Sequence, residues 1–207
     1  MKYKRLVAFG CSHTYGFGLE DCYEGKNKKD PGMYASNHAW PAVLSNLLNL
    51  ENVNMSAPGA SNKEIWYEIV NFNFKPTDLV FVMWTSFSRW CTLKSDYLSR
   101  IGTWTKGKST KAFFRYFYDS NDQNIDLNLR ISHTKYHLYN LGIKNYQLNY
   151  KERDFIPCTF TQDHPIVPLY FRFYEQTYPL AYDKTHAGKL AHRKFAENLY
   201  DEMKKNI

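Results

Sequence analysis

Near its N-terminus the chain reads Leu6-Val7-Ala8-Phe9-Gly10-Cys11-Ser12-His13-Thr14-Tyr15-Gly16. The apolar run Leu6–Phe9, closed by Gly10, is typical of a short strand buried in a parallel sheet. Ser12 follows between two glycines, on the tight turn that we expect at the end of this strand. A serine on such a turn has the setting of a nucleophile, so residues that activate it must come from elsewhere in the chain.

Several later segments have equally regular patterns. Asp78–Trp84 is almost wholly apolar, which predicts a central strand covered on both faces. Ser61 with Glu64 three residues on has the capping-box spacing, which predicts that a helix begins at Ser61. The remaining expected elements are helices over 40–50, 124–140 and from 185 or 186 to about 204, and strands over 51–55 and 143–150.

The alternation of strands and helices predicts the α/β class. We expect one domain over residues 1–207, a three-layer α/β/α sandwich with a central, mainly parallel sheet. No internal repeat, low-complexity tract or linker divides the chain. Irregular insertions are expected near residues 17–39, 91–121 and 151–182, where the sequence has no clear period.

The composition narrows the class of partner. Hydrophobic residues make up 43% and charged residues 23%, which excludes a disordered chain. The net charge of +7 favours acidic partners, but it is dispersed, so we expect a solvated basic surface rather than a nucleic-acid site. No apolar stretch is long enough to span a membrane, and no signal peptide is expected. The cysteines lack Cys-x-x-Cys spacing, so we expect a cytoplasmic protein with reduced thiols and without metal or cofactor: Cys11, Cys22, Cys91 and Cys158.

Chemistry-bearing residues follow the ends of several expected strands. Ser12 follows the first, Gly59 the second, and Thr85 with Ser86 the third, while Asp183-Lys184-Thr185-His186 precedes the last helix. The carboxyl ends of parallel strands meet at one edge of a sheet, so we expect these segments to meet there. Serine, aspartate and histidine together are the residues of acyl transfer.

These blocks resemble the SGNH (GDSL-type) hydrolases, over roughly residues 4–90 and 123–204. The first block is similar to that of small phage and bacterial members, Gly-Cys-Ser-x-Thr-x-Gly. The resemblance implies a flavodoxin-like sheet and a serine esterase in which Ser12 is the nucleophile, His186 the general base and Asp183 the residue that orients it. It implies that the N–H groups of Ser12 and Gly59 hold the oxyanion. The implied substrate is a small or glycan ester, such as an O-acetylated carbohydrate.

The chain departs from the family pattern in two blocks. Cys11 replaces the aspartate of Gly-Asp-Ser, which is not the triad acid. The third block, Trp84-Thr85-Ser86-Phe87-Ser88-Arg89, lacks the asparagine that donates to the oxyanion. A hydroxyl of Ser86 or Thr85, or the nearby Arg89, would have to replace it, and losing one such donor costs about 10²–10³-fold in rate. The alternative function is therefore a catalytically weak or inactive SGNH-fold module that binds carbohydrate or has a structural role.

The remaining candidate residues allow functional or structural interpretations. Asn62 and Arg89 either contact substrate at the pocket rim, or serve as a helix-start amide and a surface arginine. His13 and His192 are expected to be structural, and His133 with His137 has metal-ligand spacing but too few ligands for a site. The aromatic run 113–118 is either a substrate lid or core packing, of which core packing is favoured.

Overall fold

The computed structural model describes residues 2–22, 34–93, 98–151 and 166–205 of the chain. Its centre is a five-stranded sheet in the order β2-β1-β3-β6-β7, with all neighbours parallel. The strands are β1 (Arg5–Phe9), β2 (Glu51–Asn54), β3 (Asp78–Trp84), β6 (Lys144–Asn149) and β7 (Ile166–Tyr170). The helices are α1 (Ser12–Tyr15), α2 (Trp40–Leu48), α3 (Asn62–Asn71), α4 (Lys108–Tyr116), α5 (Ser120–Asn140), α6 (Phe171–Thr177) and α7 (Lys189–Lys205).

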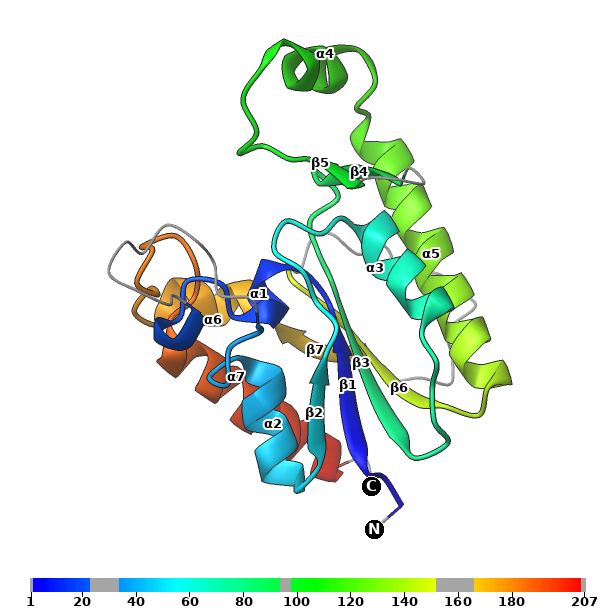
Figure 1. Cartoon of the computed structure of the whole chain (residues 1–207), viewed down its shortest axis with the longest axis vertical. Coiled ribbons are helices and arrows are strands. Elements are labelled where there is room, and N and C mark those ends of the chain that lie inside the picture. Colours follow the sequence, from blue (N-terminus) through cyan, green and yellow to red (C-terminus); the bar gives the residue numbers. More distant parts are fainter. Residues whose placement is uncertain (1, 23–33, 94–97, 152–165, 206–207) are drawn as a thin grey trace.

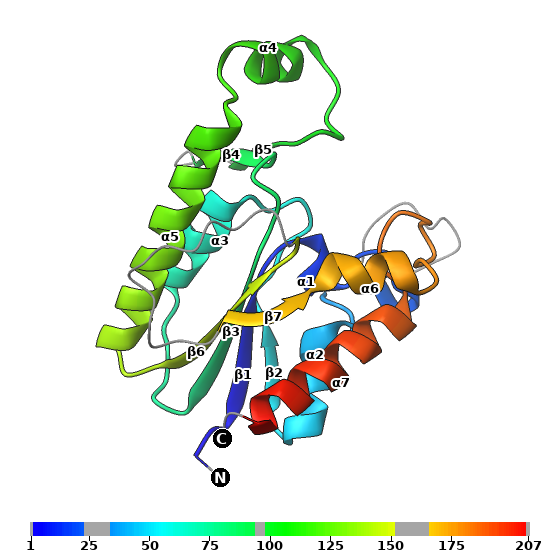
Figure 2. The same cartoon turned by 180° about the vertical axis from the view of Figure 1, so that it is seen from behind.

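Helices cover both faces of this sheet. Helices α2 and α7 pack together on one face with α6 beside α7, and α3 and α5 pack together on the other (Figures 1 and 2). The predicted three-layer α/β/α sandwich with a parallel sheet is therefore confirmed.

Strand β3 joins the two halves of the core. All of its residues are buried, and successive side chains point to opposite faces. Leu79, Phe81 and Met83 enter the core under α2 and α7, and Val80, Val82 and Trp84 enter the core under α3 and α5. A strand covered on both faces reads as a continuous apolar run, which explains why the sequence pattern was clearest here.

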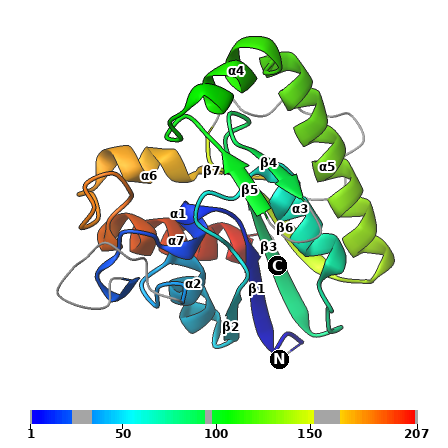
Figure 3. The same ribbon diagram turned by 45° about the horizontal axis from the view of Figure 1, so that its top comes forward.

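The carboxyl ends of the strands share one edge of the sheet. Helix α1 begins there, directly after β1, and the two chain termini lie at the opposite edge (Figures 1 and 2). A small antiparallel hairpin, β4 (Trp90–Leu93) with β5 (Leu98–Ile101), lies beyond the carboxyl edge, and α4 lies farther out (Figure 3).

The expectation of irregular structure over 91–121 and 151–182 was wrong where these segments are described. The first contains most of the β4–β5 hairpin and α4, and the second contains β7 and α6. The strands of the hairpin have four residues each, too few to establish a period. Strand β7 contains Pro168, which is tolerated because β7 is at the edge of the sheet. In the segment 17–39, Glu20–Cys22 forms a 3₁₀ helix. Residues 23–33, 94–97 and 152–165, Cys158 included, lie outside the described residues.

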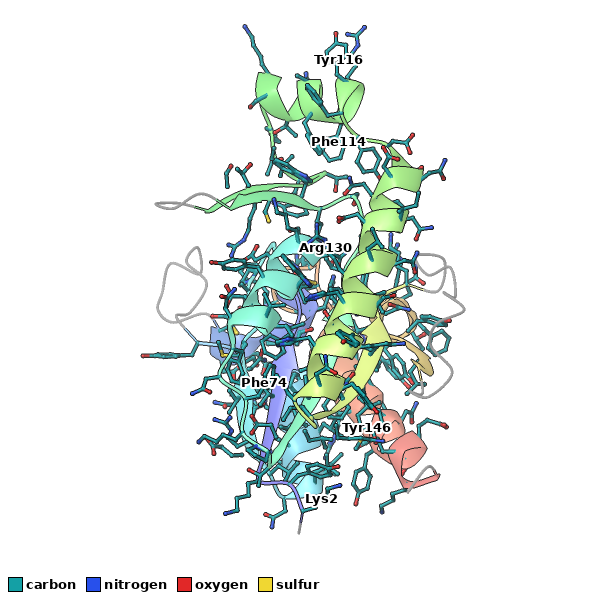
Figure 4. The ribbon with its side chains drawn as sticks, turned by 90° about the vertical axis from the view of Figure 1, so that its right-hand side faces the viewer. Lys2, Phe74, Phe114, Tyr116, Arg130 and Tyr146 are labelled. Carbon is teal, nitrogen blue, oxygen red and sulfur yellow. The ribbon has the colours of Figure 1, made fainter. Side chains whose placement is uncertain are left out.

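The favoured packing of the aromatic run 113–118 in the core was also wrong. Helix α4 has no buried residue, and the ring of Phe117 is 77% exposed. Figure 4 shows Tyr116 on the outer side of α4 and Phe114 on the side toward the rest of the molecule. Phe114 packs against the rings of Phe113 and Tyr118, its neighbours in sequence. Phe113 also packs against Trp90 of β4, with ring centroids 5.1 Å apart, so the run belongs to an aromatic cluster outside the main core.

The last helix begins at Lys189, three or four residues later than the sequence indicated. Residues 183–186 form a turn, and the backbone bridge between Leu180 and Ala187 holds that turn in place. The Gly188 N–H donates to the carbonyl of Pro179, so the chain enters the helix only after this link. Across the described residues, no helix combines the length and apolar character that a membrane crossing requires.

Candidate active site

Asp183 and His186 form a hydrogen-bonded pair on the turn before α7. His186 Nδ1 lies 2.5 Å from Asp183 Oδ2, and Asp183 Oδ1 accepts the His186 backbone N–H at 3.0 Å. Thr185 donates its N–H to Oδ1 and its hydroxyl to Oδ2, at 3.0 and 2.9 Å. Burial by itself would raise the pKa of Asp183, but the hydrogen bonds from Thr185 and His186 hold this pKa below its usual value. An ionised Asp183 favours the His186 tautomer with its hydrogen on Nδ1.

The loop after α1 packs against this turn. The Tyr182 N–H donates to the carbonyl of Gly18 at 3.0 Å, and the Ala181 N–H donates to the carbonyl of His186 at 2.8 Å. Gly18 has φ +91°, and a Cβ atom there would lie 2.8 Å from the Asp183 carboxylate. The Asp183 side chain therefore rests directly on a glycine backbone.

Ser12 is the first residue of α1 and follows β1 after two residues. The turn is tight, because a Cβ at Gly10 would lie 2.1 Å from Thr14 Oγ1, and Asn54 Nδ2 donates to the Thr14 carbonyl at 2.8 Å. Within the described part of the chain, no backbone carbonyl accepts the Ser12 N–H. This is normal for the first residue of a helix, and it leaves a hydrogen-bond donor at the carboxyl edge of the sheet.

One cavity of about 580 Å³ lies over this edge. It is lined by Ser12, Phe17, Pro58, Gly59, Arg89, Arg100, Trp104, Thr185 and His186. Four of the residues singled out in the sequence thus meet there, from segments far apart in the chain: Ser12, Gly59, Arg89 and His186. Asp183 lies behind His186 rather than in the wall. No direct hydrogen bond joins Ser12 Oγ to the His186 ring, and both residues are among those that the structure describes.

Gly59 forms part of the cavity wall on the turn after β2. Its φ of +77° belongs to the left-handed region that glycine adopts without strain. A Cβ there would contact Arg100 and Trp104 at 3.4 and 3.5 Å. No described backbone carbonyl accepts the Gly59 N–H, so this group is a second free donor beside that of Ser12.

Asn62, Thr85 and Ser86 do not line this cavity. Asn62 Nδ2 donates to the Thr85 carbonyl at 2.9 Å, and the Thr85 N–H donates to Asn62 Oδ1 at 2.8 Å. This reciprocal pair ties the start of α3 to the end of β3, so of the two readings of Asn62 the geometry favours the helix-start amide. The Ser86 hydroxyl lies 3.0 Å from that of Ser88.

His13 is buried beside Ser12, outside the set of residues that line the cavity. Its ring stacks on that of Tyr150 with centroids 4.2 Å apart, and its Nδ1 lies 3.5 Å from Glu175 Oε1 without a hydrogen bond. Burial lowers the pKa of His13 well below its usual value, with Arg89 the next contribution. The ring is therefore neutral at pH 7 and acts as packing next to the serine turn.

The other histidines have structural contacts. His192 is buried in α7, where its Nδ1 accepts the Trp40 N–H at 3.1 Å. His133 and His137 stack with ring centroids 6.2 Å apart, and Trp66 donates to His133. Within the described residues, no group of three or more metal-binding side chains comes together.

Several residues of the site were missed in the sequence. Thr185 is inside the Asp-x-x-His block, so its role as a second donor to Asp183 had a signal. Gly18 had none, because its contact is with a residue near the other end of the chain. Trp104 and Arg100 come from the segment around β5, where the pattern was too short to interpret.

Solved structures match the chain over almost its whole length. TesA matches with a TM-score of 0.57 and 13% identity, covering 99% of this chain and 100% of that one. A G-D-S-L family lipolytic protein from Veillonella parvula DSM 2008 matches with a TM-score of 0.51 and 13% identity, covering 96% of this chain and 97% of that one. The fold is that of the SGNH hydrolases. A carbohydrate esterase, described as having divergent catalytic and non-catalytic binding functions at its active site, gives 0.54 and 10%, covering 98% of this chain and 65% of that one. No family model and no curated protein sequence matches the chain.

At identities of 10–13%, these matches establish a shared fold and carry no information about the active site. The SGNH fold therefore fixes where a site is expected, at the carboxyl edge of the sheet. What this site does has to be argued from its own residues.

Proposed function

We propose that this SGNH-fold protein is a serine esterase that acts through Ser12, His186 and Asp183. The observation that carries the proposal is the Asp183–His186 pair, 2.5 Å apart, with its histidine in the wall of the cavity that Ser12 also lines. A carboxylate, an imidazole and a serine hydroxyl arranged around one cavity are the components of acyl transfer.

The proposed proton path starts from the tautomer of His186. Asp183 holds Nδ1–H, which leaves Nε2 as the free basic nitrogen. As Ser12 Oγ attacks the ester carbonyl, Nε2 takes its proton, and it returns that proton to the leaving alcohol when the C–O bond breaks. Water then attacks the acyl group on Ser12 while Nε2 takes a proton from the water. Nε2 gives this proton to Ser12 Oγ as the acyl–oxygen bond breaks, which releases the acid and the free serine.

The oxyanion would be held by backbone donors. The N–H groups of Ser12 and Gly59 lack backbone acceptors within the described residues, and both residues line the cavity. The Thr85 N–H is engaged by Asn62, so it supplies no donor without breaking that pair. Ser86 stays the proposed third donor, which requires its hydroxyl to leave Ser88 and turn to the cavity. A site with two backbone donors is expected to be slower than one with three.

The proposed substrate is a small ester, such as an O-acetylated carbohydrate. A volume of about 580 Å³ is suitable for a small ligand. Phe17 and Trp104 give the wall two aromatic faces, which suit an apolar acyl group or a sugar ring. The fold similarity to a carbohydrate esterase supports this class.

Ester hydrolysis by purified protein tests the proposal. Wild-type protein is expected to hydrolyse p-nitrophenyl acetate and acetylated sugars, and Ser12→Ala to lose this activity and the labelling by a fluorophosphonate. Ser45→Ala, which removes a buried serine of α2, is the control and should keep both. Turnover that survives in Ser12→Ala, or the absence of turnover and labelling in the wild type, would contradict the proposal.

A second candidate is a carbohydrate-binding module without turnover. It is favoured by one observation, the absence of a direct hydrogen bond between the described residues Ser12 and His186. Binding of acetylated oligosaccharide by both wild type and Ser12→Ala, with no hydrolysis by either, would identify this function.

A further inference from the structure

Arg89 lines the cavity of Ser12 and also a smaller cavity of about 260 Å³, whose wall includes Asp122 and Asp126. Asp126 pairs with Arg130, and no described carboxylate forms an ion pair with Arg89. Its guanidinium carbon lies 5.0 Å from the centroid of the Trp104 ring. Its Nη1 is buried and has no hydrogen-bond partner among the described residues. Within the same part of the chain, Arg89 takes part in no ion pair. A guanidinium group is a cation with five N–H donors and no acceptor.

The other arginine of the wall is different. Arg100 donates from Nε and Nη2 to the two carboxylate oxygens of Glu64, at 2.9 and 2.5 Å. Glu64 is itself buried at the start of α3, so this pair is internal to the protein. Arg100 is therefore paired with a carboxylate of the protein, whereas Arg89 is not. The residues that line the cavity of Ser12 include no aspartate or glutamate.

The buried Nη1 has no acceptor among the described residues, so the guanidinium group is not saturated by hydrogen bonds within the protein. A buried donor without a partner carries the full cost of its lost hydration, and this cost is larger for a charged group. The guanidinium lies beside the Trp104 ring, and a guanidinium that lines a cavity can bind the two oxygens of a carboxylate or phosphate. The position of Arg89 thus matches an anion that arrives with the substrate.

We propose that the cavity selects esters that carry an anionic oxygen group, a carboxylate or a phosphate, and that Arg89 binds this group. The inference rests on the proposed esterase function, because Ser12 and His186 line the same cavity as Arg89. The ester carbonyl would lie at Ser12, and the anion would lie at the Trp104 side. Arg89 is a specificity-determining residue in this arrangement, and it takes no part in the proton transfers.

A matched pair of esters tests this selection. Mono-p-nitrophenyl glutarate and p-nitrophenyl pentanoate have acyl chains of equal length, and only the first ends in a carboxylate. Wild-type kcat/KM is expected to be about 10- to 100-fold higher for the glutarate, the range that a hydrogen bond to a charged group supplies. Arg89→Gln should bring the ratio of the two kcat/KM values close to one, and Arg89→Lys should keep part of the preference. Competition by inorganic phosphate and by glutarate then decides between the two anions.

Arg193→Gln is the charge-matched control, because it removes an exposed cation of α7 that pairs with Glu197 on the same helix. It should keep the wild-type preference. Equal kcat/KM for both esters in a wild type whose turnover depends on Ser12 would overturn the inference and leave the esterase function intact. An equal loss on both esters in Arg89→Gln would also overturn it, because selection by charge changes only the anionic one.

A binding measurement separates the inference from the esterase proposal. Ser12→Ala protein lacks the proposed nucleophile, so the affinity for each intact ester is measured by calorimetry. Tighter binding of the glutarate, lost in Ser12→Ala/Arg89→Gln, supports anion selection even if the wild type turns over neither ester. Equal affinity for both esters overturns it.

Discussion

The Asp183 carboxylate rests on the backbone of Gly18, where a Cβ atom would lie 2.8 Å from the Asp183 side chain. The two loops are also joined by the hydrogen bond from the Tyr182 N–H to the Gly18 carbonyl. The position of the proposed catalytic carboxylate is therefore set by a residue near the N-terminus, in addition to the turn that carries it.

Gly18→Ala is expected to displace Asp183 and to lower ester hydrolysis by about 10²-fold, because small misplacements of catalytic groups have effects of this size. The left-handed backbone adds a stability cost of about 1–2 kcal/mol. Gly142→Ala is the matched control, since Gly142 has φ +67° and open space around its Cβ position. Chemical denaturation should show a stability loss in both variants, and kinetics a loss of activity in Gly18→Ala alone. An active Gly18→Ala enzyme would show that the contact is dispensable.

Asp183→Asn tests how the histidine is oriented. The amide does not fix the Nδ1–H tautomer as a carboxylate does, so Nε2 is no longer held as the basic nitrogen. We expect kcat for ester hydrolysis to fall by about 10²–10⁴-fold. Asp119→Asn changes an exposed acidic residue that caps α5, and it should leave kcat unchanged. Wild-type kcat in Asp183→Asn would exclude Asp183 from the proposed triad.

Buried His192 makes stability depend on pH. Burial lowers the pKa of His192 to about 3, whereas an unfolded histidine titrates near its usual value of about 6.5. Between these values the unfolded chain binds one more proton, so the free energy of unfolding falls as pH falls from 6.5 toward 3. The slope is about 1.4 kcal/mol per pH unit for this group. It is absent above pH 6.5, where both states are neutral.

His192→Asn provides the measurement, because its Oδ1 can still accept the Trp40 N–H. Urea denaturation at several pH values between 4 and 6.5 should give a slope smaller by about one proton in this variant. Ser45→Ala changes a buried side chain of α2 that does not titrate, and it should keep the wild-type slope. Equal slopes in His192→Asn and wild type would show that His192 is protonated within the fold.

The pair between Asn62 and Thr85 is expected to be structural. Asn62→Ala leaves the Thr85 N–H and carbonyl without partners in a buried place, which should lower the free energy of unfolding by about 2–4 kcal/mol. Asn71→Ala removes an exposed amide near the other end of α3 and should change stability little. A stable Asn62→Ala protein with a raised KM would instead indicate a substrate contact.

Much of the fold was predictable because its elements have strong patterns. β3 is buried on both faces and reads as one apolar run, and the Ser61 cap does accept the Glu64 N–H. Elements without such patterns were missed. Helix α1 has four residues, the hairpin strands are short, and α4 has no buried face to give it a period.

The candidate site was predictable to the extent that it follows the strand ends. Ser12, Gly59 and His186 could be placed together from the topology of a parallel sheet. The Gly18 contact, the Arg89–Trp104 contact and the Asn62–Thr85 pair depend on tertiary structure, and no local pattern in the chain encodes them.

The link between Gly18 and Tyr182 also has a consequence for synthesis. A ribosome releases the serine turn early and the Asp183–His186 turn near the end, so a nascent chain contains the first long before the second. The wall of the cavity is complete only after this late segment has docked on the loop behind α1. Contacts of such long sequence separation form slowly, since the chain must first lose the entropy of a very large loop. Reactivity toward esters should therefore appear as a late event in folding, after the sheet has formed.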